Sequence, residues 1–229
     1  MFDPGPRLRC AAELILPHKK IVDIGTDHAY LPTYLVLTGK SERVLACDIG
    51  VRPLENARKT VNCFGLSDKI QLRISDGLQK VSADEAEEIS ICGMGGTLMA
   101  EILGAAEWIK RSGMHLVLQP MTHSEDVRQF LCKNGFSITR ECFVEERSKV
   151  YCVISAHYSG EAEAFDEGFC YFGYLPVTDD IQEAYVSSRL KQLDKKLMAL
   201  RNSHGDEAEV GRLEEIRRYY EERIHNENI

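Results

Sequence analysis

The 229-residue chain lacks any uninterrupted apolar stretch of membrane-spanning length, which argues against a transmembrane protein. Its N-terminus also lacks the charged and then apolar pattern of a secretion signal. From these absences we expect a cytoplasmic protein with no membrane partner. Hydrophobic residues make up 44% of the chain and charged residues 28%, so one medium domain, or one domain with a small appendage, can build a sizeable core.

Metal-binding and disulfide motifs are missing as well. The eight cysteines are scattered, and none forms a CxxC pair or lies at zinc-ligand spacing from another cysteine or a histidine. Cys92 and Cys152 stand inside apolar runs, where a reduced thiol packs as a small hydrophobic group. We expect reduced thiols, no metal and a monomer.

An excess of positive charge is also absent, since the net charge is −8. This argues mildly against a nucleic-acid partner, because phosphate binding depends on Lys and Arg. Basic residues nevertheless gather in three places, and solvated faces are the simpler interpretation of such clusters. The clusters are Arg7, Arg9, His18, Lys19 and Lys20; Arg52, Arg58 and Lys59; and the segment 189–201.

Short apolar runs bounded by turn residues predict five strands, at about 21–24, 43–49, 70–75, 88–92 and 115–120. Helices are expected between them, and strands that alternate with helices predict a parallel sheet covered on both faces. The expected helices end before Pro17, run from near Pro32 to Gly39 and from about Pro53 to Phe64, follow Gly96 through Leu103, and run from Ser124, the candidate N-cap, to Lys133.

Residues 136–158 predict an antiparallel hairpin, because FSITRECFVEE and SKVYCVISAHY are rich in β-forming residues and meet at polar residues near 146–148. Such a hairpin at the sheet edge is typical of Rossmann-like methyltransferases. After about residue 160 the pattern changes to apolar residues in steps of three and four, on either side of a break at 203–206. These positions are Leu190, Leu193, Leu197 and Leu200, then Val210, Leu213, Arg217, Tyr220 and Ile224.

The predicted fold class is therefore α/β: a Rossmann-like class I methyltransferase sheet with a C-terminal antiparallel hairpin, plus a small helical domain. We expect a cofactor-binding domain over residues 1–160 and a helical coiled-coil domain over residues 161–229.

The dinucleotide fingerprint GxGxxG is absent from the turn after the first predicted strand, IVDIGTDHAYLP. This turn has one glycine, Gly25, flanked by Asp23 and Asp27, and these carboxylates would repel a phosphate. A cationic ligand without phosphate, such as S-adenosylmethionine, is a better match. Asp48 lies 23 residues after Gly25, where an acid binds the ribose in related folds, and Asp76 could accept a hydrogen bond from the adenine amino group.

Each of these residues also has a simpler structural interpretation. Asp23 and Asp27 complement the dipole of the following helix equally well, and His28 alone is more often a structural hydrogen-bonding residue than a catalyst. Asp48 and the pair Asp76-Gly77 are ordinary turn residues when taken singly. The three glycines of Gly93-Met94-Gly95-Gly96 are harder to explain in this way, since they imply close approach of backbone or ligand.

The segments DIGTDHAYLP, ICGMGG and LVLQP, with RLRCAAELI upstream, together resemble the bacterial tRNA adenine-N1 methyltransferases of the TrmK family. The resemblance covers about residues 7–158, and the C-terminal helical hairpin is similar to the family's appended coiled-coil domain in kind rather than in motif. Members of this family methylate N1 of the adenine at tRNA position 22. The resemblance therefore implies S-adenosyl-L-methionine as cofactor and tRNA as partner.

The resemblance also implies roles for individual residues. Asp27 would be the catalytic residue facing the adenine, while Arg7, Arg9, Gln119 and Pro120 would lie on the tRNA side. The family often has Gln-Pro-Asn where this chain has Gln-Pro-Met, so an asparagine contact to the base would be missing here. The implied cofactor-binding residues are Asp23, Gly25, His28, Asp48, Ile49, Asp76, Gly77, Gly93, Met94, Gly95 and Gly96.

The function predicted from the sequence is S-adenosylmethionine-dependent methylation of adenine N1 in tRNA. Two other classes stay open at this point. A methyltransferase acting on a small molecule or a protein would keep every cofactor feature, and the acidic net charge favours it. A non-catalytic nucleotide-binding module would need neither Asp27 nor a glycine-lined target pocket. An NAD-dependent oxidoreductase is disfavoured because the glycine fingerprint is absent.

Overall fold

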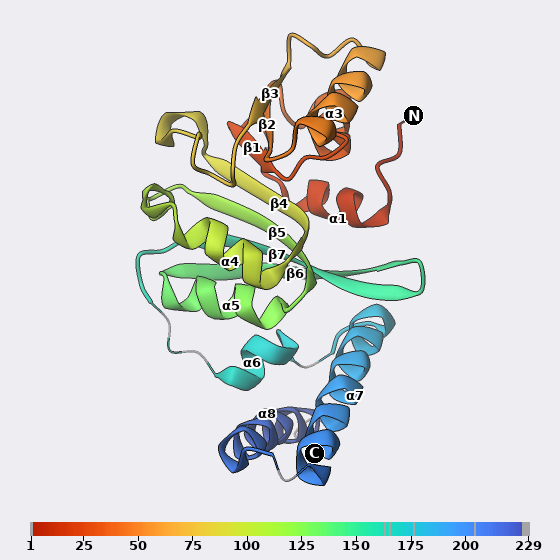
Figure 1. Ribbon diagram of the computed structural model, residues 1–229, viewed down its shortest axis with the longest axis vertical. Helices are drawn as coiled ribbons and strands as arrows, with labels where there is room; N and C mark the ends of the chain where they lie inside the picture. Colours follow the sequence, from red (N-terminus) through yellow and green to blue (C-terminus); the bar gives the residue numbers. More distant parts are fainter. Residues whose placement is uncertain (1, 163, 165, 176, 204, 226–229) are drawn as a thin grey trace. The chain divides into compact units, whose positions relative to one another are not determined.

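The computed structural model describes residues 2–162, 164, 166–175, 177–203 and 205–225 (Figure 1). The chain divides into two compact units, residues 1–163 and residues 164–229. Within the described ranges, no helix is both long enough and apolar enough to cross a membrane. All eight cysteines are free thiols.

One seven-stranded sheet, in the order β3-β2-β1-β4-β5-β7-β6, forms the centre of the first unit. Strands β1 to β5 are parallel, and β7 runs antiparallel to both β5 and β6, so the predicted sheet with an antiparallel hairpin at its edge is confirmed. The strands are β1 Ile21–Ile24, β2 Val44–Asp48, β3 Ile70–Ile74, β4 Glu88–Gly95, β5 His115–Thr122, β6 Phe136–Glu146 and β7 Lys149–Tyr158.

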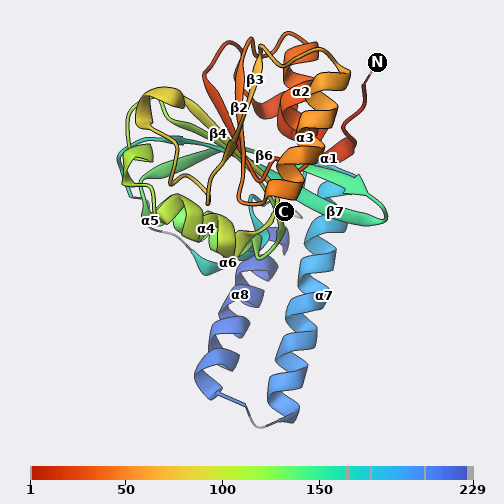
Figure 2. The ribbon, with the colours of Figure 1, turned by 45° about the horizontal axis from the view of Figure 1, so that its top comes forward.

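Five helices cover this sheet on both faces (Figure 2). Apolar side chains of α1, α2 and α3 share one core cluster with residues of the sheet, and α4 and α5 pack against each other on the opposite face. The helices are α1 Pro6–Leu14, α2 Tyr30–Leu37, α3 Val51–Cys63, α4 Gly96–Gly104 and α5 Ser124–Lys133; η1 Ala83–Glu85 and η2 Glu107–Ile109 are short 3₁₀ turns.

The central strand β1 explains why a mainly apolar run, interrupted only by Asp23, predicts a strand buried on both faces. Ile21, Val22 and Ile24 are each at most 2% exposed, because β1 pairs with β2 on one side and β4 on the other and is covered on both faces. The strand order reverses between β1 and β4. In open parallel sheets ligands bind at such a reversal, beyond the carboxyl ends of the strands.

Two local predictions were wrong. Ser124 is the first residue of α5 rather than its N-cap, which is His123 in a left-handed conformation (φ 52°) without a side-chain cap. Strands β4 and β5 also continue past their predicted ends, through Gly95 and Thr122. They remain paired there across two register irregularities, so much of the glycine segment belongs to the strand itself.

A buried polar cluster lies at the opposite, amino-terminal end of β4 and β5. The fully buried Glu88 accepts hydrogen bonds from the backbone N–H of Leu16, at 3.1 Å to each oxygen, and contacts His115 Nδ1 at 2.5 Å. His115 Nε2 in turn lies 2.9 Å from Ser155 Oγ. The cluster therefore links the segment that follows α1 to β4, β5 and β7, at the end of the sheet opposite the carboxyl ends of the parallel strands.

The second unit consists of α6 Glu167–Phe172, α7 Asp180–Asn202 and α8 Glu207–His225. The two long helices lie side by side as an antiparallel pair (Figure 2). Leu193 and Leu197 on α7 and Leu213 on α8 are buried at predicted positions. After Leu213, however, α8 buries Ile216 and Tyr219 rather than the predicted Arg217 and Tyr220. The guanidinium of Arg217 instead contacts Asp194 and Glu221. The coiled-coil assignment stays a prediction.

Candidate active site

Most of the predicted site residues lie at the carboxyl ends of the parallel strands. Asp23 is the penultimate residue of β1, Asp48 ends β2, and Asp76 follows β3 by two residues. The glycine segment 93–96 forms the end of β4 and the start of α4, and Gln119 lies in the neighbouring part of β5. Parallel pairing brings together segments that are far apart in the sequence.

Gly25 lies where the turn after β1 contacts Met94 of the glycine segment 93–96. Its φ of +74° lies in the left-handed region, and its N–H donates to the carbonyl of Cys47 at 2.8 Å. A Cβ at this position would lie 2.0 Å from Met94 Cε. Gly25 is therefore favoured by its left-handed backbone conformation, and the flexible end of the Met94 side chain from the glycine segment packs closely against it.

Asp23 lies in β1, two residues before Gly25, and only 4% of the residue is exposed. Its Oδ1 accepts a hydrogen bond of 2.8 Å from Ser90 Oγ on β4. Burial raises the pKa of Asp23 to about 6; the Ser90 hydrogen bond opposes this rise and the nearby charge of Asp48 adds to it. A cationic group bound above this carboxyl would favour its ionised form.

Asp27 differs from Asp23 in almost every respect. Its side chain is 62% exposed, its φ of 45° is left-handed, and its Oδ2 lies 3.7 Å from His28 Nε2. The ring of His28 stacks on Tyr30 with 5.0 Å between centroids. Asp27 therefore combines an unusual left-handed backbone with a carboxylate that is open to solvent.

The carboxylate of Asp48 is fixed by two backbone donors. Oδ1 accepts from the N–H of Gly50 at 2.9 Å, and Oδ2 accepts from the N–H of Asp27 at 3.2 Å. The next residue, Ile49, is 68% exposed, and Ile74, which pairs with Asp48 across the strands, is 46% exposed. An oriented acid beside accessible apolar side chains is chemically suited to a nucleoside, whose hydroxyl groups adjoin a flat ring. Sequence reasoning missed Ile74, although its place at the end of the third strand was a signal.

The Asp76-Gly77 turn is organised by Ser75. Its hydroxyl donates to the carbonyl of Gly77 at 2.8 Å and accepts from the N–H of Lys80 at 3.1 Å. The exposed carboxylate of Asp76 accepts from Gln79 Nε2 at 3.1 Å. Gly77 has a φ of +51°, so the left-handed turn itself accounts for this glycine.

The glycines of the 93–96 segment have different structural reasons. Gly93 is left-handed (φ +84°), and its N–H donates to Gln119 Oε1 at 3.2 Å. At Gly96 a Cβ would lie 2.0 Å from the backbone oxygen of His123, so the packing of α4 against the end of β5 alone requires glycine there. A ligand-binding role is not needed to explain Gly96, and its assignment to the cofactor site stays a prediction.

The two arginines predicted to contact the tRNA have different surroundings. Arg7 reaches Gln119, with Nη1 2.6 Å from Oε1, whereas Arg9 pairs with Asp3 at 2.7 Å and its side chain is 44% exposed. Pro120 is buried, and its carbonyl accepts from Gln119 Nε2 at 2.9 Å. Met121 follows and is 38% exposed, so an apolar thioether occupies the predicted asparagine position.

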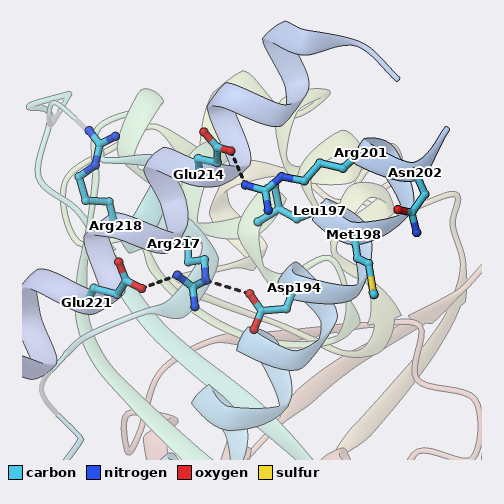
Figure 3. A pocket seen from close by; sticks show the side chains of 9 residues that line it. All are labelled: Asp194, Leu197, Met198, Arg201, Asn202, Glu214, Arg217, Arg218 and Glu221. Atoms are coloured by element: carbon cyan, nitrogen blue, oxygen red, sulfur yellow. Dashed lines mark hydrogen bonds and ion pairs between the residues drawn. The ribbon is translucent and has the colours of Figure 1, made fainter. Parts of the chain in front are cut away.

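The second unit contains a hollow between its two long helices, shown in Figure 3. Arginine side chains line it, but Arg201 pairs with Glu214 at 2.6 Å and Arg217 pairs with Asp194 at 3.0 Å. Elsewhere in this unit Lys196 pairs with Glu209 at 2.6 Å. Within the basic cluster at 189–201, Lys196 and Arg201 are thus neutralised by carboxylates across the helix pair. No group of three or more His, Cys, Asp or Glu side chains in the described part of the chain could hold a metal ion.

The structure places the carboxyl groups of Asp23, Asp27 and Asp48 around one glycine turn at the switch point of a Rossmann-like sheet. Before any comparison of sequences, this defines the class as a Rossmann-like protein whose site favours a cationic ligand over a phosphate. The sequence profile of a family described as a methyltransferase domain matches residues 5–154, in agreement with that class. A tRNA (adenine(22)-N(1))-methyltransferase from Bacillus subtilis (strain 168) is 38% identical over 160 residues, which is 70% of this chain and 67% of that protein. The chain belongs to the TrmK family of tRNA methyltransferases.

Solved structures agree. The crystal structure of B. subtilis TrmK superposes with a TM-score of 0.72 and 30% identity, covering 96% of this chain and 97% of that one. A putative tRNA (m1A22) methyltransferase from Streptococcus pneumoniae, solved in complex with S-adenosyl-L-methionine, gives a TM-score of 0.79 and 28% identity, covering 95% and 99%. These structural matches extend over both units, whereas the family profile ends at residue 154.

Proposed function

We propose that this protein is an S-adenosyl-L-methionine-dependent methyltransferase that methylates N1 of the adenine at position 22 of tRNA, in the cytoplasm. The observation that carries the proposal is the acid-lined end of β1 and β2, where Asp23, Asp27 and Asp48 surround one glycine turn. The B. subtilis relative bears the name of this activity, and the S. pneumoniae structure contains this cofactor.

The residues of the crevice fit the cofactor chemically. We assign the methionine part to the turn of Asp23, Gly25 and His28, where the carboxyls suit its ammonium and sulfonium charges. The ribose hydroxyls are assigned to the oriented carboxylate of Asp48. The adenine ring is assigned to the surface of Ile49, and its amino group to Asp76.

When bound, S-adenosyl-L-methionine would supply a sulfonium methyl group: the lone pair of adenine N1 would form the new N–C bond as the C–S bond breaks, and neutral S-adenosylhomocysteine would leave. N1 of neutral adenine already carries that lone pair, so the protein needs no strong base. Its main task is to align N1 with the methyl carbon. The product base is cationic, and the exposed carboxylate of Asp27 stabilises that charge as it develops or accepts a proton from the exocyclic amino group.

Adenine N1 lies on the Watson–Crick edge, so the target base must leave any base pair before it reaches Asp27. Binding of the tRNA body would then depend on phosphate contacts and shape. We assign cofactor binding to the first unit and part of the tRNA contact to Arg7, Arg9 and the helical second unit. The ion pairs within the second unit leave only part of its positive charge for phosphates.

The proposal is tested by incubating the protein with unmodified tRNA and isotope-labelled S-adenosyl-L-methionine, then mapping the methylated nucleoside by mass spectrometry. We expect one N1-methyladenosine at position 22, and none in a matched tRNA with guanine there. Label at another position would overturn the site assignment. The net charge of −8 favours a second candidate, a methyltransferase for a small molecule or protein, and that activity would leave tRNA unlabelled while the cofactor still binds.

A further inference from the structure

The guanidinium of Arg7 links three elements of the first unit. Its Nε donates to Glu146 Oε2 and its Nη1 donates to Gln119 Oε1, both at 2.6 Å. Nη1 also lies 3.3 Å from Met121 Sδ, and the guanidinium carbon lies 5.4 Å from the ring centre of Tyr151. The side chains of Arg7 and Glu146 are only 20% and 21% exposed, so water screens their attraction less than it would at the open surface.

Gln119 connects Arg7 to the glycine segment through hydrogen bonds. Its Oε1 accepts from Arg7 and also from the N–H of Gly93 at 3.2 Å, while its Nε2 donates to the carbonyl of Pro120 at 2.9 Å. Gln119 is fully buried, so its carboxamide serves this network rather than an incoming base. Arg7 thereby determines which way the amide points and holds the left-handed peptide of Gly93 in place.

Glu146 lies next to the two-residue turn of the β6–β7 hairpin. It is the last residue of β6 and pairs with Lys149, the first residue of β7, so that only Arg147 and Ser148 form the turn. Both have positive φ values, 51° and 62°, as in the two-residue turns that follow the twist of paired strands. The hairpin packs along α1, which carries Arg7.

This network lies on one side of the crevice. In the sheet order, the acids of the proposed cofactor site lie in or just after β1, β2 and β3. The residues Gly93, Gln119 and Glu146 belong to β4, β5 and β6, on the other side of the switch point. We propose that Arg7 and Glu146 are positioning residues for the target adenine, and that Glu146 acts through Arg7. This inference rests on the proposed function, because it assigns the β4–β5 side of the crevice to the base that receives the methyl group.

Variants at the hairpin end test the inference in the full-length protein. Glu146→Ala removes the partner of Arg7, and we expect kcat for tRNA methylation to fall about tenfold while the cofactor Kd changes less than about twofold. Glu146→Gln keeps an acceptor and should recover part of kcat. Glu145→Ala is the matched control, since the adjacent exposed side chain projects from the opposite face of β6 and should leave kcat unchanged.

Coupling between the two residues is tested with a double variant. Because Glu146 acts through Arg7, Arg7→Gln combined with Glu146→Ala should be no slower than Arg7→Gln alone. A loss in the double variant equal to the product of the single losses would overturn the inference, as would a cofactor Kd that weakens in parallel with kcat.

A readout without tRNA separates this inference from the proposed function. Hydrogen exchange of the Gly93 amide should speed up in Arg7→Gln and in Glu146→Ala, because the acceptor Gln119 is no longer held, and it should not change in Glu145→Ala. Unchanged exchange would refute the positioning network even if the protein methylates tRNA. Faster exchange in a protein that leaves tRNA unmethylated would instead refute the proposed function.

Discussion

Asp23 and Asp27 stand four residues apart in one turn, yet the fold gives their carboxyl groups opposite environments. Asp23 is 4% exposed and hydrogen-bonded to Ser90, while the side chain of Asp27 is 62% exposed. The buried acid is suited to holding a fixed cationic ligand, and the exposed one is suited to meeting a substrate that arrives and leaves. The sequence predicted both residues, but only the structure shows that one is buried and the other exposed.

The raised pKa of Asp23, about 6, predicts a pH-dependent cofactor affinity. A cationic ligand binds the ionised carboxyl, so affinity should be constant above pH 7 and should fall by up to about tenfold for each pH unit below 6. Calorimetry near pH 6 in buffers of different ionisation enthalpy should detect proton release on binding. Asp23→Asn should bind more weakly at pH 7 and lose the dependence; a wild-type affinity that is flat from pH 5 to 8 would contradict the assignment.

Asp27→Asn tests the catalytic assignment. The amide keeps the size of the side chain but removes the charge that stabilises a cationic product, so we expect methyl transfer to slow about 100-fold or more. Cofactor affinity should stay within several-fold of the wild type. Single-turnover kinetics with tRNA measures the first quantity and calorimetry the second. Asp68→Asn, at an exposed acid in the α3–β3 loop, is the control, and normal turnover in Asp27→Asn would exclude the role.

At the scale of elements, strands β4 and β5 illustrate what local patterns can and cannot predict. Their apolar cores were predicted because buried parallel strands are continuous hydrophobic runs. Their extension to Gly95 and Thr122 was missed, since a glycine-rich segment has little strand preference and is held only by pairing with its neighbour. The hairpin β6–β7 was predicted almost to the residue, because its strands are long and its turn is short.

The first and last residues of α4 are Gly96 and Gly104, and we expect substitution by alanine to have opposite effects on stability at these two positions. A Cβ at Gly96 would lie 2.0 Å from a backbone oxygen of His123, which cannot move aside as a side chain can. Gly96→Ala should therefore lower the free energy of unfolding by about 1–3 kcal/mol in urea denaturation. At Gly104 the nearest atom would be Phe130 Cε2 at 3.6 Å, so Gly104→Ala should be neutral or stabilising by up to about 1 kcal/mol. Equal stabilities would contradict the packing explanation.

At the scale of the whole molecule, we assign cofactor binding to the first compact unit and part of the tRNA binding to the second. The residues of the proposed cofactor site lie in residues 1–163, and in the helical second unit Lys196, Arg201 and Arg217 pair with carboxylates. Net charge alone would have argued against a nucleic-acid partner, and family membership outweighs that argument. Phosphate contacts depend on where free charges lie rather than on their sum.

Removal of the second unit tests this division. A chain of residues 1–163 that retains its circular dichroism spectrum should bind the cofactor within about twofold of the full-length protein, because the crevice is intact. Its affinity for tRNA should fall about tenfold or more, as phosphate contacts are lost. Fluorescence anisotropy with labelled tRNA measures this loss. Equal tRNA binding by both chains would show that the helical unit does not contribute.

The sequence by itself determined the alternation of strands and helices, the edge hairpin, and the acids and glycines at the strand ends, because each depends on near neighbours along the chain. Only the tertiary structure decided that Asp23 is buried, that Gly96 packs on His123, and that Arg7 contacts Gln119 and Glu146. Those partners of Arg7 are 112 and 139 residues away. Contacts over such separations depend on how helices pack on the sheet, and the spacing of residues within a short segment does not predict that packing.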